Sequence, residues 1–574
     1  MSASDKKKLR KELKEAVLTE KQTQQQREAK KLKAYTLTFI IAMVLVVAIV
    51  AGVLLTPYIE GGLRRATTAV TIADHELSAA ELSYYYVDAI SGYQDEVYSQ
   101  YYNYYGDYWY YMLGFDSTLA LNKQVKDTEK NTTWADYFVD EAINNAKSVY
   151  ALYDDAMANN YKLSEEDQKE LDDSLASLSE YVKKQTDYSS VAAYLRSIYG
   201  PSASEDTYKE YYTITSTASA YYDDHLDSIE YKTEDYRAYE AEKKHLYNSY
   251  SFIYYTINMS SYLGEGHKDE NGSTFWTDDE KDAARVQVKA DMQALVAAGI
   301  TDKASFDAAV QSLTINKYDK DGNPVAADKM ATATESIDVS YNSMYLNTAA
   351  KDWVIKEERK AGDFDVFPIY DSASEKEEDE SKKIINGYYV VLFNETDTNE
   401  VHLANVRHIL SKFKGGTKDS NGNTTYSDAE KQAAKTEAEN LLKQFKDSIA
   451  NETDAAKIED TFAKLANKES DDQSGQVTNG GLYEDIYPGQ MVESFEKWCF
   501  DADRKPGDTG LVETTYGWHV MFYSSTDEMT YRDSMIKTDM LNDDMAKWHD
   551  GLVEKAKTTV NNLTFMDYDI VVGQ

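Results

Sequence analysis

The stretch YGWHVMFY, residues 516–523, decides the fold, because another part of the chain repeats its pattern. That other part is NGYYVVLF, residues 386–393. Both stretches are rich in the β-branched and aromatic residues that are typical of strands, and both have glycine in second place. Where the first stretch has His519, the second has Tyr389. The chain has only eight histidines, so this exchange needs an explanation.

Two further blocks recur ahead of these strands, in the same order and without gaps. KDENGSTFWTDDEKDAA at 268–284 matches KDSNGNTTYSDAEKQAA at 418–434, and WVIKEERKAGD at 353–363 matches WCFDADRKPGD at 498–508. Three matching blocks in one order indicate an internal duplication. We place the two copies at 236–396 and 401–526.

Each copy reads as strand, insertion, helix, helix, loop, helix and closing strand. In the second copy the first strand is ANVRHILSKF, and the first helix is SDAEKQAAKTEAENLLKQF, with Ser427 and Glu430 as its capping box. KIEDTFAKLANKES and SFEKWCF give the other helices, and GWHVMFY closes the unit. This order predicts an α+β domain in which helices pack on a small sheet.

The N-terminal part has the pattern of a membrane anchor. The first 33 residues carry eleven Lys and Arg against five Asp and Glu, and no charge follows from Ala34 to Leu55. A helix of that length spans about 30 Å, the thickness of the bilayer core. We therefore predict a basic cytoplasmic tail at 1–33, a single transmembrane helix at 34–59, and the rest of the chain outside the cell membrane. A cleaved signal peptide is the alternative, but the apolar run and the tail are long for one.

The region 66–235 is predicted to be mostly helical. Its first long helix should begin after Ser78, with Glu81 completing a capping box. An amphipathic helix in the segment 527–574 is expected to complete this region. The segment 84–111 holds 12 tyrosines, which either form an aromatic core or give a sticky surface for unfolded chains.

Composition excludes several classes of function. The formal net charge of −39 disfavours nucleic acid, which needs a basic surface. The single cysteine, Cys499, rules out an internal disulfide and disfavours a Cys-based zinc site. The chain has no HExxH, no GxSxG and no glycine-rich phosphate loop. We therefore expect no metal ion and no cofactor.

One calcium-like pattern leaves an alternative open. Residues 269–280 and 419–430 carry acidic or amide residues at positions 1, 3 and 12 of a calcium loop. Their glycine stands at position 4, however, whereas that loop turns at position 6. Asn-Gly also favours a tight hairpin turn, which is the preferred interpretation.

The second copy holds a set of residues that the first copy lacks. In order along the chain stand RHIL, ESDDQS, a Gly-Gly pair, GQMVESF and YGWHV. These motifs, over about 120 residues, resemble a parvulin-type peptidyl-prolyl cis-trans isomerase domain. The wider plan resembles the bacterial extracytoplasmic foldases of the PrsA/SurA type, which combine a helical chaperone region, one or more parvulin domains and a C-terminal helix that packs back on the helical region.

The resemblance implies roles for individual residues. Two histidines and an acidic residue would form the centre of the site, and an apolar wall would receive the proline ring. The implied catalytic residues are His408, Asp472 and His519, and the implied substrate-binding residues are Met491, Phe495, Gln490, Leu482, Thr514 and Tyr516. The partners would be unfolded or newly translocated polypeptides with Xaa-Pro bonds. The alternatives are that the two histidines are merely buried together, that both copies only bind unfolded chains as a holdase or scaffold, or that the protein is a tyrosine-rich adhesin.

The first copy acts as a control within the chain. Tyr255 is expected opposite His408, and Tyr389 opposite His519. Counting back from the paired tryptophans, Leu346 replaces Met491 and Ala350 replaces Phe495. We therefore predict a degenerate first copy that keeps the scaffold and has lost the site.

Overall fold

The structure of the chain is a computed structural model. It describes Met43 and the stretches 62–313, 317–318, 324–325, 332–419, 422, 424–472, 479–566 and 568. The membrane-spanning helix expected at 34–59 lies outside these described residues, Met43 excepted. Within the described part, no helix is both long and apolar enough to cross a membrane. The described residues form both helices and strands, which agrees with the α+β class.

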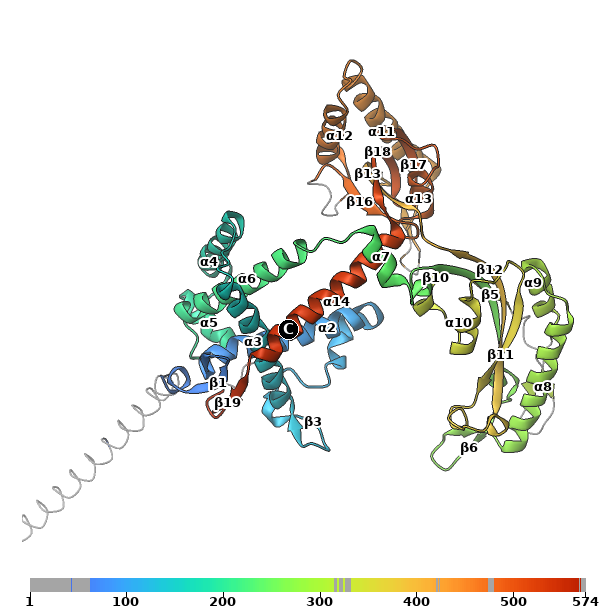
Figure 1. Cartoon of the computed structure of the whole chain (residues 1–574), viewed down its shortest axis with the longest axis horizontal. Coiled ribbons are helices and arrows are strands. Elements are labelled where there is room, and N and C mark those ends of the chain that lie inside the picture. The colour runs from blue at the N-terminus through green and yellow to red at the C-terminus, as the bar shows by residue number, and fades with distance from the viewer. Residues whose placement is uncertain are drawn as a thin grey trace, which may run out of the picture. The chain divides into compact units, whose positions relative to one another are not determined.

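The chain divides into two compact units (Figure 1). Unit 1 is Met1–Glu230 together with Asn542–Gln574, and unit 2 is Tyr231–Leu541. Helix α14, Tyr531–Lys555, contributes its first residues to unit 2 and its last ones to unit 1.

Unit 1 is mainly helical. Its elements are β1 (Thr68–Ile72), β2 (His75–Ser78), α2 (Ala79–Tyr105), η1 (Gly106–Met112), η2 (Leu121–Lys123), β3 (Val125–Asp127), β4 (Thr132–Thr133), α3 (Trp134–Ala158), α4 (Glu165–Gln185), α5 (Val191–Tyr199), α6 (Glu205–Asp227) and β19 (Thr558–Val560). The C-terminal strand β19 pairs with β1, and β1 pairs with β2, so the two ends of the described chain share one small antiparallel sheet.

Helix α2 begins as its sequence predicts. The Ser78 N–H donates to the Glu81 carboxylate at 2.7 Å, and the Glu81 N–H donates to the Ser78 hydroxyl at 3.2 Å. The first turns of α2 are buried in the core of the unit, where Tyr84 and Tyr86 are fully covered. Its last turns are exposed, with Tyr104 82% accessible. The tyrosine-rich segment is therefore part of the core at one end of the helix and exposed at the other.

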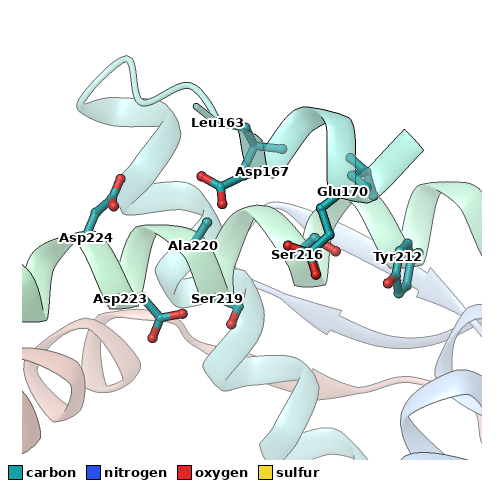
Figure 2. Close-up of a pocket in the computed structure, with 10 residues that line it drawn as sticks. Leu163, Asp167, Glu170, Tyr212, Ser216, Ser219, Ala220, Asp223 and Asp224 are labelled. Atoms are coloured by element: carbon teal, nitrogen blue, oxygen red, sulfur yellow. The ribbon is translucent and has the colours of Figure 1, made fainter. Parts of the chain in front are cut away.

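An acidic hollow of about 340 Å³ lies between α4 and α6. Figure 2 shows carboxylates around it from both helices, Asp167 and Glu170 from α4 and Asp223 and Asp224 from α6. The Tyr161 hydroxyl donates to Asp224 at 2.6 Å. The hollow adds to the negative charge of unit 1.

Unit 2 contains two lobes built to one plan. In the first lobe the sheet order is β10-β5-β12-β11, and in the second it is β16-β13-β18-β17, with antiparallel neighbours throughout.

The first lobe consists of β5 (Ser249–Asn258), α8 (Asp278–Ala297), α9 (Lys303–Gln311), β10 (Thr334–Ser340), α10 (Thr348–Val354), β11 (Phe364–Tyr370) and β12 (Ile385–Asp397). The second consists of β13 (His402–Lys412), α11 (Asp428–Ser448), α12 (Ala455–Glu469), β16 (Leu482–Ile486), α13 (Glu493–Cys499), β17 (Thr509–Glu513) and β18 (Gly517–Thr530). Shorter elements are α7 (Thr233–Glu240), η3 (Lys244–Leu246), η4 (Met259–Tyr262), β6 (His267–Lys268), β7 (Thr274–Phe275), β8 (Lys317–Tyr318), β9 (Pro324–Val325), η5 (Tyr341–Ser343), η6 (Glu380–Lys382), β14 (Thr417–Lys418) and β15 (Thr424–Thr425).

Each sheet separates two small cores. In the second lobe, α11 and α12 pack on one face around Ile409, Val520 and Phe522. The short helix α13 packs on the other face, where Val406 and Met521 are buried. Residues alternate between faces along a strand, so every second side chain of β13 and β18 belongs to the α13 face.

The two insertions with calcium-like sequences carry hairpins, β6–β7 and β14–β15. Glu280 accepts hydrogen bonds from the N–H and the hydroxyl of Thr277 and lies 3.1 Å from the His267 ring, so its carboxylate caps α8. Glu430 caps α11 in the same way through Ser427. Among the residues that the structure describes, no group of three or more His, Cys, Asp or Glu side chains is placed to hold a metal ion.

A buried ion pair joins several segments of unit 2. Arg532, at the start of α14, lies 2.5 Å from the Glu240 carboxylate at the end of α7, and both side chains are about 5% exposed. The Arg532 guanidinium also donates to the backbone carbonyls of Tyr247 and Thr398 and to the Asn248 side chain. One side chain thus connects α7, the turn before β5, the link between the lobes and α14.

Candidate functional site

The second lobe brings two of its histidines together on one face of its sheet. His408 lies on β13 and His519 on the neighbouring strand β18, where they are diagonal neighbours because Leu410 pairs with His519. Their Nδ1 atoms are 3.0 Å apart, and both side chains are buried, 3% and 6% exposed.

Each histidine has a second hydrogen-bond partner. His408 Nε2 lies 3.1 Å from the Asp472 carboxylate, which also accepts a hydrogen bond of 3.0 Å from the Tyr483 hydroxyl. At the other end, His519 Nε2 lies 2.9 Å from the Thr514 hydroxyl. The result is a continuous row of side chains from Thr514 through both rings to Asp472.

The carboxylate sets the direction of this row. Asp472 can only accept, so His408 Nε2 carries a hydrogen and donates to it. With both rings neutral, His408 Nδ1 is then an acceptor, His519 Nδ1 donates to it, and His519 Nε2 accepts from the Thr514 hydroxyl. Each ring is thereby fixed in a single tautomer.

Backbone contacts hold this row in place. The Asp471 N–H donates to the Leu410 carbonyl at 2.8 Å, which ties the loop after α12 to β13. The His408 N–H donates to the Gly481 carbonyl at 2.9 Å. Gly481 has a φ of +68°, and a Cβ there would lie 2.3 Å from the His408 carbonyl oxygen. Only glycine fits, so the Gly-Gly pair of the sequence permits the close approach of β16 to β13.

An apolar wall stands beside the histidines. Phe495 is 4% exposed and presents its ring edge-on to both imidazoles, with centroid distances of 5.6 Å to His408 and 5.4 Å to His519. Met491 packs against the same cluster, half-buried. The Tyr483 ring lies 4.9 Å from His408. The site therefore combines a polar row with an aromatic side wall.

The other implied substrate-binding residues lie in different positions. Thr514 is part of the row, and the exposed Tyr516, 59% accessible, donates its N–H to the Thr514 hydroxyl. Gln490 is exposed, and its side chain accepts from the Tyr487 N–H.

Leu482 is not brought to the histidines. It pairs with Arg407, so its side chain lies on the other face of the sheet from His408. The next residue, Tyr483, supplies the contact instead, and sequence reasoning missed it. The sequence of β16 contains no signal that separates these two neighbours, because only the pairing of β16 with β13 places Tyr483 on the face of His408.

Comparison with known families decides what this site belongs to. Residues 388–524 match the family model of the PPIC-type PPIASE domain. This segment is a parvulin-type peptidyl-prolyl isomerase domain. The family expected from the motifs is thus confirmed, and the histidine row, Phe495 and Met491 all lie within the matched parvulin domain.

The chain is also similar to foldases. Foldase protein PrsA 1 of Listeria innocua is 39% identical over 71 residues, which are 12% of this chain and 24% of that protein. The crystal structure of PrsA from Bacillus subtilis is 22% identical, with 29% of this chain and 54% of that chain covered at a TM-score of 0.17. The chain thus spans about a quarter of the length of the curated relatives that it matches.

The first lobe has tyrosines where the parvulin domain has its histidines. Thr256 pairs with Tyr389 as Leu410 pairs with His519, so the residue at the place of His408 is Tyr254. The prediction of Tyr255 at this place was wrong by one residue, because the three matching sequence blocks did not include this strand. The rings of Tyr254 and Tyr389 are 6.3 Å apart.

Burial changes the protonation of the parvulin site. The pKa of His519 falls to about 3, because burial and the neighbouring His408 disfavour its charged form more than Asp472 favours it. His519 is therefore a neutral ring at physiological pH, with one donor and one acceptor nitrogen.

The low pKa of His519 predicts acid sensitivity. The unfolded chain binds a proton at this histidine below about pH 6.5 while the folded chain does not, so folding stability falls as pH falls from there toward about 3. Between pH 6.5 and pH 5 we expect this residue to remove about 2 kcal/mol of stability. Urea denaturation at both pH values measures it. A His519→Leu variant should lose less stability over this range, and an equal loss would contradict the assignment.

Proposed function

We propose that this protein is a peptidyl-prolyl cis-trans isomerase and foldase that acts on unfolded polypeptides. One observation carries the proposal: the row Thr514–His519–His408–Asp472 stands beside Phe495 within a parvulin-type domain. Similarity to Foldase protein PrsA 1 supports the wider role.

The residues suit a reaction that breaks no bond. Rotation about a peptide bond has a barrier of about 18–20 kcal/mol, because twisting it removes the resonance of the amide. Phe495 and Met491 offer an apolar seat for the proline ring, while the hydrogen-bonded imidazoles hold fixed dipoles near the amide. A site that fits the twisted amide better than either planar form lowers the barrier by preferential binding. No group in this scheme has to give up or take a proton.

Domain roles follow from the same proposal. Residues 401–526 form the isomerase domain, and 236–396 is a degenerate parvulin-like domain that serves as spacer or binding surface. The helical region 66–235, completed by 527–574, acts as a chaperone-like cradle. The apolar segment 34–59 anchors the chain in the cell membrane behind a cytoplasmic tail, so that the bulk of the chain works outside it.

Exchange NMR on a Xaa-Pro peptide tests the catalytic part. The full chain in detergent should accelerate cis-trans exchange, and His519→Ala should lower the rate by about tenfold, since it removes the hydrogen-bond partner of His408 Nδ1 and one partner of the Thr514 hydroxyl. The matched control is Tyr389→Ala, the same position in the first lobe, which should leave the rate unchanged. Absence of exchange in the wild type would favour a non-catalytic holdase.

Tyr483 offers a finer test of the row. Tyr483→Phe removes the hydrogen bond to Asp472 but keeps the ring beside His408 and Phe495. Loss of one hydrogen bond to a charged group amounts to about 1.5–3 kcal/mol, so we expect kcat/KM to fall roughly tenfold or more with KM little changed. Tyr388→Phe in the first lobe is the control. A rise in KM alone would show that the hydroxyl contacts the peptide rather than Asp472.

A further inference from the structure

The end of helix α2 and the following turn η1 form an exposed aromatic surface. We call it the aromatic tip and define it by six tyrosines that are all at least 40% accessible: Tyr98, Tyr102, Tyr104, Tyr105, Tyr108 and Tyr111. All of η1 is described, and none of its residues is buried. Soluble proteins rarely leave such a cluster exposed unless it meets a partner.

The aromatic tip is an ordered surface, because its rings pack on one another. The Tyr98 ring meets Trp109 edge-on at 5.3 Å and lies 4.7 Å from Tyr102, so η1 folds back against α2. Tyr108 and Tyr111 are stacked at 6.3 Å. These contacts order the exposed rings, and rigid tyrosines give contact area at a small loss of side-chain entropy.

The sequence segment that contains the tip carries charge of one sign. From residue 66 to residue 122 the sequence has no Lys or Arg and eight Asp and Glu. Asp95, Glu96 and Asp107 lie exposed in or beside the tip. The tip also contains the C-terminal end of α2, whose last turn has no basic residue, so the negative end of the helix dipole is not neutralised there.

Unit 1 already holds one cation against aromatic rings. Lys126 places its ammonium group 4.5 Å from the Trp134 ring centre and 4.2 Å from that of Tyr137. Ring faces attract cations through their quadrupole, and an acidic surround strengthens that attraction.

We propose that the aromatic tip binds extended polypeptide segments that carry Lys or Arg among apolar residues. Ring faces would take both the apolar side chains and the cations, while the acidic residues and the helix end provide the long-range attraction. This inference rests on the proposed foldase function, since it gives the clients of the foldase a preferred segment. It does not involve the isomerase site.

Two labelled unfolded peptides test this binding. They have equal length and apolar content and no proline, and one carries Lys and Arg where the other carries Glu. Fluorescence anisotropy with the full chain in detergent should show the cationic peptide binding at least tenfold more tightly, with affinity falling as salt rises. Equal affinities for the two peptides would overturn the proposal.

Variants locate the binding on the tip. The triple variant Tyr104→Ser, Tyr108→Ser and Tyr111→Ser removes exposed rings only and should weaken cationic-peptide binding by about tenfold or more. Tyr345→Ser, which removes a ring 83% exposed in unit 2, is the control and should change nothing. Unchanged binding in the triple variant would overturn the proposal. Binding of a neutral oligosaccharide at the tip without binding of the cationic peptide would also overturn the proposal.

The two proposals fail in different ways. The triple variant should keep wild-type exchange rates on a short Xaa-Pro peptide, because its substitutions lie in unit 1. An inactive wild type that still selects the cationic peptide through the tip would overturn the isomerase proposal and leave this one standing.

Discussion

Replacing Phe495 with alanine is expected to lower kcat/KM for a Xaa-Pro peptide by about 10- to 100-fold in the full chain. The Phe495 ring lies against both histidine rings. Burial of a phenylalanine-sized side chain contributes about 1.5–3 kcal/mol, and each 1.36 kcal/mol of lost transition-state binding is tenfold in rate. The proline ring would lose that seat, and water would enter beside His519.

The same change also removes core packing, so the measurement needs a matched control. Phe495 is 4% exposed, and a buried Phe→Ala change destabilises a domain by about 3–5 kcal/mol. Phe367→Ala in the first lobe removes a ring that is 9% exposed and that pairs with Tyr389, yet it should leave the exchange rate unchanged. Both variants are first checked for folding by urea denaturation. A folded Phe495→Ala protein with an undiminished rate would exclude Phe495 from the substrate seat.

The sequence predicted the two central strands and the three helices of the second lobe because their signals are local, but it did not predict the edge strands β16 and β17. Helix starts are set by capping boxes such as Ser427 with Glu430, and strands by β-branched and aromatic runs. The duplication added a second copy of most signals. The row of His408, His519 and Asp472 followed from motifs whose order and spacing resemble one family.

The contacts that could not be predicted from the sequence depend on the register between paired strands. Leu482 and Tyr483 are adjacent, and only the pairing of β16 with β13 decides which one faces His408. For the same reason, Tyr255 was expected at the position equivalent to His408 in the first lobe, where the structure has Tyr254. Thr514 was expected only as a substrate-binding residue, and its hydrogen bond to His519 depends on the pairing of β17 with β18. Long-range contacts of this kind have no signal in the neighbouring residues.

The Arg532–Glu240 pair connects segments that lie nearly 300 residues apart, and its removal should destabilise unit 2. Burial alone would raise the pKa of Glu240, but hydrogen bonds from Arg237 and Arg532 outweigh it and hold that pKa below its usual value. The carboxylate is therefore charged and buried, and Arg532→Met would leave it short of a partner. Removing one member of a buried pair destabilises by about 3–5 kcal/mol.

Urea denaturation of Arg532→Met, Arg532→Lys and the double variant with Glu240→Gln measures this effect. Lysine keeps the charge but cannot reproduce the fork that reaches Glu240, Asn248 and the Thr398 carbonyl, so we expect an intermediate loss. The double variant should lose less than the sum of the two single variants, because no buried charge is left unpaired. Lys443→Met, which breaks an exposed pair with Asp447, is the control and should change stability by no more than about 0.5 kcal/mol. If Arg532→Met were no less stable than this control, the apolar cluster around Tyr236, Tyr247 and Ile536 would be sufficient to hold the start of α14 in unit 2.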